Sequence, residues 1–290
     1  MIQNAQGLLA VDVDGTLITD HGHITDRVRD ALGRASATGW EIVIASGRTF
    51  PAAMMVVDEF PFVRYAVVSN GACIIDVQAR QTIHCTALGV KNVRRAVEVM
   101  REAGAPPALY TTSFAYQKVL YDRFDETCEF FRWYVTNDPR CIRVGNVLAH
   151  ADDVLQIGSV AKRETIFRIR DRLTADDVVV MTMPFESPRL GGKNHNFWFA
   201  QIVARGATKF AALVSLAGLI GVPAGRIVAV GDNYNDIEMI SRADVGVAMG
   251  NAPDEVKAVA RVVVGTNNDS GLSEVVDQIL LSAEYFPQPD

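Results

Sequence analysis

The chain has 290 residues, of which 49% are hydrophobic and 21% charged, and its formal net charge is −6. This length allows two domains with a sizeable core, and the acidic balance argues against a nucleic-acid-binding surface, which would need clustered lysine and arginine. Residues 1–10 do not resemble a signal peptide, and no apolar run reaches the length of about 18 residues that a membrane helix needs. We therefore expect a cytoplasmic protein without a membrane segment.

Three apolar runs, each ending in small polar residues, organise the first 80 residues. We expect strands near 8–11, 42–45 and 65–69, with helices between them near 26–38 and 51–59. This alternation is typical of a doubly wound α/β fold with a parallel sheet. Ligands bind beyond the carboxyl ends of such strands, so the three polar endings are expected to build one site at an edge of the sheet.

The pattern changes to mixed α+β in the middle of the chain. We interpret residues 84–195 as an inserted domain, and residues 1–83 together with 196–290 as a discontinuous parallel-sheet core. A strand expected at 196–203 would then begin the return to the core.

Two features of the insertion each allow a structural and a functional interpretation. A polar, glycine-rich loop at 189–195 is expected to be a solvated hairpin tip, with contact to an anionic substrate as the alternative. A group of aromatic residues is expected to pack inside the inserted domain, with stacking on a ligand as the alternative. Its members are Phe130, Phe131, Trp133 and Tyr134.

The four cysteines are scattered along the chain with no metal-binding spacing. They are Cys73, Cys85, Cys128 and Cys141. A disulfide framework is typical of short secreted chains, so we expect reduced thiols in the core and neither a disulfide nor a zinc site.

The regular alternation of helix and strand resumes at Lys209. We expect a helix over 209–219 and a strand over 226–230 that runs directly into the acidic segment GDNYND at 231–236. Further strands near 245–249 and 262–264 would complete the parallel sheet.

Paired acids follow two of the predicted core strands. Asp12 and Asp14 come after the first strand, and Asp232 and Asp236 come after the strand at 226–230. If those strands are neighbours, the carboxylates converge and repel one another unless a cation compensates them. Mg²⁺ prefers oxygen ligands and leaves room for water and phosphate, so the pattern predicts a split magnesium site. The alternative for each pair is a turn or helix-cap role.

The other polar strand ends suit phosphate. Ser46, Gly47 and Asn70 can offer a hydroxyl and backbone N–H groups to phosphate oxygens, and Lys209 can add a positive charge. Alone, a lysine at a helix start is usually solvated, so its role depends on the whole group. A carboxylate beside Mg²⁺ can attack phosphorus, and a second carboxylic acid can protonate the leaving alcohol and then activate water.

Four short motifs resemble, in order, those of the haloacid dehalogenase superfamily of phosphohydrolases. They are DVDGT at 12–16, SGR at 46–48, Lys209, and GDNYND at 231–236. The insertion between the second and third motifs resembles the Cof-type branch (subclass IIB), whose members carry an α/β cap there. SNGA at 69–72 and NNDSGLSEVV at 267–276 are similar to stretches of that branch.

The resemblance implies a role for each matching residue. Asp12 would be the nucleophile and a metal ligand, Asp14 the general acid/base and a ligand through its carbonyl, and Asp232 the second carboxylate ligand. The resemblance places the remaining residues around these: Ser46 and Lys209 on the phosphoryl group, Asn70 near it, and Asn235 and Asp236 orienting the metal site. Thr16 would hydrogen-bond within its loop, and Thr16 and Asn235 are also expected to contact the phosphorylated substrate. Phe210 departs from the small residue common in the branch.

These patterns favour a Mg²⁺-dependent phosphatase acting on a small phosphorylated metabolite, such as a sugar phosphate, through an aspartyl-phosphate. A phosphoryl transferase or mutase on the same scaffold is the alternative, because Asp14 suits both reactions. A non-enzymatic binding role is a third interpretation, disfavoured because no core acid is missing. A monomer or a homodimer is expected.

Overall fold

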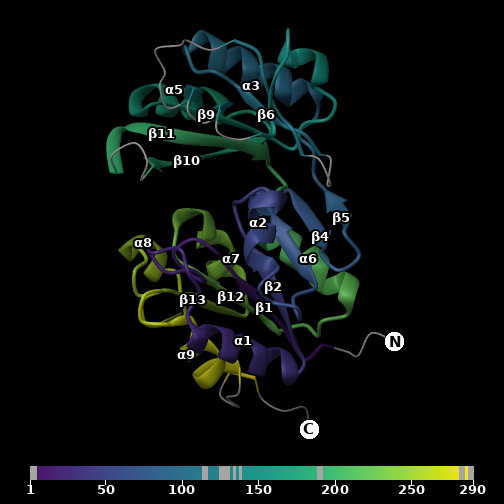
Figure 1. The fold of residues 1–290 in the computed structure, drawn as a ribbon, viewed down its shortest axis with the longest axis vertical. Coiled ribbons are helices and arrows are strands. Elements are labelled where there is room, and N and C mark those ends of the chain that lie inside the picture. Colours follow the sequence, from purple (N-terminus) through teal and green to yellow (C-terminus); the bar gives the residue numbers. More distant parts are fainter. Residues whose placement is uncertain are drawn as a thin grey trace. The chain divides into compact units, whose positions relative to one another are not determined.

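The computed structural model describes residues 5–112, 117–123, 131–132, 135–136, 139–187, 192–280 and 285–286. The chain divides into two compact units, one formed by Met1–His84 with Thr208–Asp290 and the other by Cys85–Ala207 (Figure 1). In the part of the chain that is described, no helix has the length and apolar character needed to cross a membrane.

The first unit is built on an eight-stranded sheet. Its strand order is β14-β13-β12-β1-β2-β3-β4-β5, parallel from β14 to β3, with β4 antiparallel to β3. The strands are β1 (Gly7–Val11), β2 (Trp40–Ala45), β3 (Tyr65–Val68), β4 (Cys73–Asp76), β5 (Gln81–Cys85), β12 (Ile227–Gly231), β13 (Val245–Ala248) and β14 (Val262–Val263). Every residue of β1 and β3 is buried, as expected for parallel strands covered on both faces.

Helices cover this sheet. They are α1 (Asp26–Ala37), α2 (Phe50–Val57), α6 (Lys209–Ile220), α7 (Ile237–Arg242), α8 (Asp254–Lys257) and α9 (Leu272–Glu274), the last continued by a π-helical segment at Val275–Leu280. The apolar stripe of α6 packs in one cluster with Leu8 and Val43 of the sheet. Alternate residues of a strand face opposite sides, so one face of β1 and β2 supports α6.

The second unit is a six-stranded sheet of order β10-β11-β9-β6-β7-β8. Its strands are β6 (Ala108–Tyr110), β7 (Val119–Tyr121), β8 (Cys141–Arg143), β9 (Gln156–Lys162), β10 (Val178–Ser187) and β11 (Gly192–Ala204). Helices α3 (Val90–Glu102) and α5 (Arg163–Leu173) pack together on one face (Figure 1). A doubly wound core with an inserted α+β unit is the fold class that the sequence predicts, and it is confirmed.

The predicted boundary at residue 196 is displaced. That residue lies inside β11, which pairs antiparallel with β10 and β9 and so belongs to the inserted unit, which ends at Ala207. The apolar run at 196–203 is equally compatible with either sheet, and only its non-local pairing decides between them. The expected polar loop is also shorter, because β10 extends to Ser187 and β11 begins at Gly192.

Two sequence expectations fall on or near residues outside the described ranges. Phe131 is buried against β6 and β7, as expected for a core aromatic residue, whereas Phe130, Trp133 and Tyr134 lie outside the described residues. The tip at 188–191 also lies outside them.

The expectation of reduced cysteines is wrong for two of the four. Cys73 and Cys85 are disulfide-bonded, and they lie on β4 and β5, which are neighbours in the sheet. Cys141 is free, and Cys128 lies outside the described residues. Spacing in the sequence does not reveal which cysteines a hairpin brings together, so the scattered pattern was a poor guide.

Candidate active site

The predicted acidic strand ends meet because β1 and β12 are adjacent parallel strands. Figure 1 shows β1 and β12 side by side. Val11 pairs with Val230, so Asp12 and Asp232 leave the sheet at the same edge although 220 residues separate them. On the other side of β1, Val11 pairs with Ile44, which brings the start of the Ser46 loop to that edge as well.

Lys209 links two of the acids. Its Nζ donates hydrogen bonds of 2.6 Å to Asp12 Oδ1 and of 2.6 Å to Asp236 Oδ1, and the lysine is only 3% exposed. Burial lowers the pKa of Lys209, but the two neighbouring carboxylates outweigh that effect and raise it. The ammonium therefore stays charged, and the interpretation of a solvated lysine is excluded.

The start of α6, which carries Lys209, lies directly against the loop after β3. Thr208 caps the helix by accepting a hydrogen bond from the backbone N–H of Ala211 at 3.1 Å. Gly71, at φ +98°, lies so close that a Cβ there would be 2.1 Å from the Thr208 carbonyl. Only glycine permits this approach, which fixes the lysine beside the loop that contains Asn70.

Asp12, Asp232 and Asp236 form a compact carboxylate cluster, in which one oxygen from each side chain lies within 4.8 Å of the other two. Burial and the charge of Asp236 raise the pKa of Asp12 well above its usual range, against the opposing effect of Lys209. Burial and the same neighbour raise the pKa of Asp232 to about 7. One lysine does not compensate two buried carboxylates and a third that is partly buried, so the cluster fits a hard cation held by oxygen ligands.

Both oxygens of Asp236 already carry hydrogen bonds. Oδ1 accepts from Lys209, and Oδ2 accepts from the backbone N–H groups of Asp232 at 3.1 Å and Asn233 at 3.0 Å. A Cβ at Gly231 would lie 2.5 Å from Asp236 Cγ, so glycine is required for the carboxylate to fold back on its own loop. Asp236 thus fixes the loop, and Asp12 and Asp232 have more capacity for a metal ion.

Asp232 is held by the loop that follows β1. Thr16 Oγ1 donates to Asp232 Oδ1 at 3.0 Å, and Asn251 Nδ2 lies 3.4 Å from Asp232 Oδ2. Gly15, at φ +82°, makes this contact possible, because a Cβ there would be 2.2 Å from Asp232 Oδ2. Residues 12–16 therefore do form a turn, as the structural alternative expected, and the same turn contacts Asp232 of the acidic cluster through Gly15 and Thr16.

Asp14 does not join the cluster through its side chain. Its carboxylate is 60% exposed and accepts two hydrogen bonds from Arg48, at 2.8 Å from Nε and 2.6 Å from Nη2. The sequence led us to expect three or four converging carboxylates, and the structure brings together three. Arg48 was part of the SGR motif but had no assigned role.

The predicted phosphate-binding residues lie together beside the cluster. Ser46 is buried and its Oγ accepts from the Arg48 N–H at 3.1 Å, while the Asn70 N–H donates to the Ser46 carbonyl at 3.1 Å. Asn235 Nδ2 donates to Asn70 Oδ1 at 2.9 Å, and a Cβ at Gly47 would lie 3.0 Å from that same oxygen. Ser46, Gly47, Asn70 and Asn235 therefore form one polar cluster.

The backbone around Asn70 is strained. Ser69 and Asn70 have φ values of 52° and 55°, and Gly71 follows at 98°. Left-handed conformation at consecutive non-glycine residues costs free energy and persists where surrounding contacts enforce it, which is common at functional sites.

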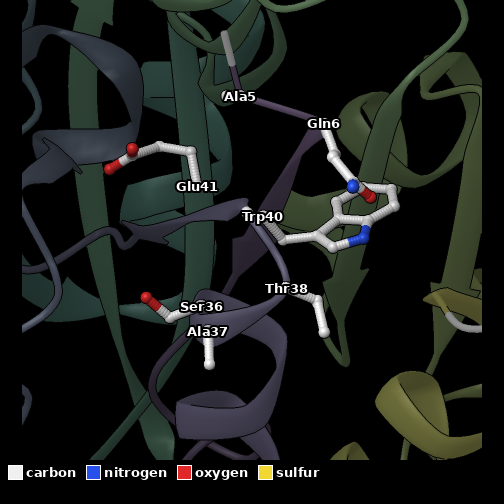
Figure 2. Close-up of a pocket in the computed structure, with 8 residues that line it drawn as sticks. Ala5, Gln6, Ser36, Ala37, Thr38, Trp40 and Glu41 are labelled. Carbon is white, nitrogen blue, oxygen red and sulfur yellow. The ribbon is translucent and has the colours of Figure 1, made fainter. Parts of the chain in front are cut away.

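A separate cavity of about 500 Å³ lies at the opposite edge of the same sheet. Figure 2 shows its lining residues, among them Gln6, Trp40 and Glu41, which mark the amino ends of β1 and β2. None of the acidic cluster lines it. Ligands in parallel sheets bind at carboxyl ends, so this cavity is not the catalytic site.

A family model for haloacid dehalogenase-like hydrolases matches residues 9–276. The chain belongs to the haloacid dehalogenase-like hydrolases. This match spans both the acidic core and the inserted unit.

Similar proteins of this family are phosphatases. The chain is 27% identical over 287 residues to 5-amino-6-(5-phospho-D-ribitylamino)uracil phosphatase YitU of Bacillus subtilis (strain 168), covering 96% of this chain and 97% of that protein. It is 26% identical over 275 residues to pyridoxal phosphate phosphatase YbhA of Escherichia coli (strain K12), covering 93% and 97%. A solved subclass IIB sugar phosphatase shares the fold, with a TM-score of 0.73, 22% identity, and coverage of 93% and 98%.

The expected family is confirmed, and these relatives support a phosphatase enzyme, as the motifs led us to expect. Two polar residues close to the acidic cluster, Arg48 and Asn251, had been given no role at the site from the sequence. Each follows the carboxyl end of a core strand by three residues, and that position was the signal that could have identified them.

Proposed function

We propose that this phosphatase hydrolyses a small phosphomonoester with Mg²⁺ as cofactor, through an aspartyl-phosphate formed on Asp12. The observation that carries the proposal is the arrangement of Lys209 and the carboxylates: the buried ammonium bonds Asp12 at 2.6 Å, and Asp232 lies in the same cluster. A carboxylate beside a fixed positive charge, at the carboxyl edge of a parallel sheet, is arranged for attack on phosphorus.

Asp12 and Asp232 would hold the magnesium ion, together with the backbone carbonyl of Asp14. The bound ion supplies positive charge that neutralises the phosphoryl oxygens during transfer. Lys209 adds a second positive charge from the protein, and it orients Asp12 through a direct hydrogen bond. Ser46, Gly47, Asn70 and Asn235 supply the polar surface against which the phosphoryl group binds.

In the first chemical step, an Asp12 oxygen bonds to phosphorus as the bond to the leaving alcohol oxygen breaks. Asp14 gives that oxygen a proton. In the second step, Asp14 takes a proton from water, the water oxygen bonds to phosphorus, and Asp12 leaves as a free carboxylate. The exposed position of Asp14 suits a group that exchanges protons with substrate and water.

A sugar phosphate or a similar phosphorylated metabolite is the proposed substrate class. The similar proteins YitU and YbhA are named for phosphate esters of a ribityl compound and of pyridoxal. Every catalytic residue named above comes from the first unit. We therefore assign the choice among phosphomonoesters to the inserted unit, Cys85–Ala207.

A panel of phosphorylated metabolites, assayed for phosphate release with Mg²⁺ and with EDTA, tests the proposal. We expect Mg²⁺-dependent release from at least one sugar phosphate or related ester. Transfer to an added acceptor sugar in place of release would establish the phosphotransferase alternative. Release that is unaffected by EDTA would contradict the magnesium requirement.

A further inference from the structure

Two asparagines form a hydrogen-bonded chain that ends at the acidic cluster. Asn251 lies between β13 and α8, and Asn267 lies after β14. The Asn267 N–H donates to Asn251 Oδ1 at 3.0 Å, and Asn251 Nδ2 donates to the Gly15 carbonyl at 2.8 Å and lies 3.4 Å from Asp232 Oδ2. Neither asparagine has a part in the chemistry proposed above.

The partners determine the orientation of the Asn251 amide. A backbone N–H only donates and a backbone carbonyl only accepts, so Oδ1 must face Asn267 and Nδ2 must face Gly15. The same orientation directs an N–H donor at Asp232 Oδ2. With Thr16 donating to Oδ1 of the same carboxylate, each Asp232 oxygen has a protein donor on one side.

Asn267 also holds the other end of the loop that contains Asp12 and Asp14. Its Nδ2 donates to the Ile18 carbonyl at 3.0 Å and to Asp20 Oδ1 at 3.0 Å, and the residue is only 4% exposed. The two asparagines therefore contact this loop at two carbonyls, those of Gly15 and Ile18. Asn251 and Asn267 are themselves held together, because the Gly250 N–H donates to the Gly265 carbonyl at 3.0 Å.

We propose that Asn251 and Asn267 are positioning residues for magnesium binding: Asn267 orients Asn251, and Asn251 fixes both the Asp232 carboxylate and the loop that follows Asp12. The inference rests on the proposed function, in which Asp232 is a magnesium ligand. Groups that orient metal ligands through hydrogen bonds affect metal affinity without touching the ion. Fixing a carboxylate before the ion arrives reduces the ordering that binding requires.

Titration of the full-length, metal-free protein with Mg²⁺ by calorimetry, without substrate, tests this proposal. We expect Asn251→Ala to raise the Mg²⁺ dissociation constant about 10- to 100-fold, the range typical of such partners, and Asn267→Ala to raise it by a smaller factor. Asn268→Ala is the matched control. Its side chain contacts Asp20 at 2.9 Å and does not contact Asn251, so it should bind Mg²⁺ as the wild type does.

A second readout separates positioning from a general loss of structure. In phosphate release, Asn251→Ala should need a correspondingly higher Mg²⁺ concentration for half-maximal activity, while the rate at saturating Mg²⁺ stays within a few-fold of wild type. Asn251→Ser, which is too short to reach Gly15, replaces Asn251→Ala if the alanine variant does not fold.

Two results would overturn the proposal. One is Mg²⁺ affinity of the Asn251 variant within twofold of wild type, and the other is an equal loss in Asn268→Ala. A failure of the proposed function is distinguishable: wild-type protein that binds Mg²⁺ but releases no phosphate would contradict the proposed activity and leave the calorimetric comparison intact, whereas wild-type protein that does not bind Mg²⁺ would overturn both proposals.

Discussion

Arg48 holds both carboxylate oxygens of Asp14, at 2.6 and 2.8 Å, while its backbone N–H donates to Ser46. A bidentate pair of this kind fixes the plane of the carboxylate as well as its position. The SGR motif therefore connects the proposed phosphate-binding surface to the proposed acid/base.

Replacing Arg48 should impair proton transfer to the leaving group. We expect Arg48→Gln to lower kcat/KM about 10- to 100-fold for an alkyl phosphate, because small displacements of a reacting group are costly. The loss for p-nitrophenyl phosphate, whose leaving group needs little protonation, should be several-fold smaller. Steady-state kinetics with both substrates measures the difference. Arg34→Gln, which removes an exposed ion pair with Asp277, is the control, and equal losses for both substrates would contradict the positioning role.

Replacing the proposed nucleophile should abolish turnover while the protein stays folded. Asp12→Asn keeps the shape of the side chain and removes one repelling charge from the cluster, and Lys209 retains its bond to Asp236. We expect phosphate release to fall by at least about 10³-fold, as is typical of a lost nucleophile, with little change in the free energy of unfolding. Wild-type turnover by this variant would exclude Asp12 as the nucleophile.

Loss of Lys209 should destabilise the metal-free protein. Lys209→Met has a similar length but leaves Asp12 and Asp236 buried without their shared partner. Breaking a buried pair in this way costs about 3–5 kcal/mol. Urea denaturation in EDTA measures the change, and Mg²⁺ should recover part of it by compensating the same carboxylates. A variant as stable as the wild type in EDTA would show that the lysine does not balance the cluster.

Magnesium should stabilise the folded protein through the acidic cluster. A ligand that binds only the folded state at 100 times its dissociation constant adds about 2.7 kcal/mol to the free energy of unfolding. We expect thermal melts to show a higher Tm with Mg²⁺ than with EDTA, and Asp232→Asn to lose most of that response. An equal Mg²⁺ response in the variant would place the ion elsewhere.

Glu41 should make stability fall as pH rises above its ordinary pKa. Burial raises the pKa of this carboxyl, and its Oε1 has no hydrogen-bond partner among the described residues. A raised folded-state pKa means that the folded protein holds this proton more tightly, so the stabilisation is present at acidic pH and lost as pH rises through the raised value. The free energy of unfolding of Glu41→Gln, relative to that of the wild type, should therefore be higher at pH 7 than at pH 4. Denaturation at both pH values measures this, and a difference that is the same at both would contradict the prediction.

Local sequence patterns are enough to predict the helices and strands of this chain and the residue types of its acidic site. Apolar runs followed by Asp12, Ser46 and Asp232 indicate buried strands with polar carboxyl ends, and these signals depend only on near neighbours. Parallel strands present those ends at one edge, which is why an acidic site was predictable before any coordinates were known.

The arrangement of those residues depends on contacts between distant segments. Pairing of β1 with β12 is what brings Asp12 to Asp232, and pairing of β11 with β10 and β9 assigns residues 196–204 to the inserted unit. The disulfide between Cys73 and Cys85 likewise depends on strand pairing, since the neighbouring strands β4 and β5 bring the two sulfur atoms together. No local signal encodes such contacts.

The tertiary structure also separates the two aspartates of the opening motif, which the sequence places side by side. Asp12 is buried with Lys209, whereas Asp14 is exposed and bonded to Arg48. Spacing alone places both carboxylates near one point. The proposed division of roles, with Asp12 as nucleophile and Asp14 as acid/base, rests on these two environments, one buried beside a fixed positive charge and one open to solvent.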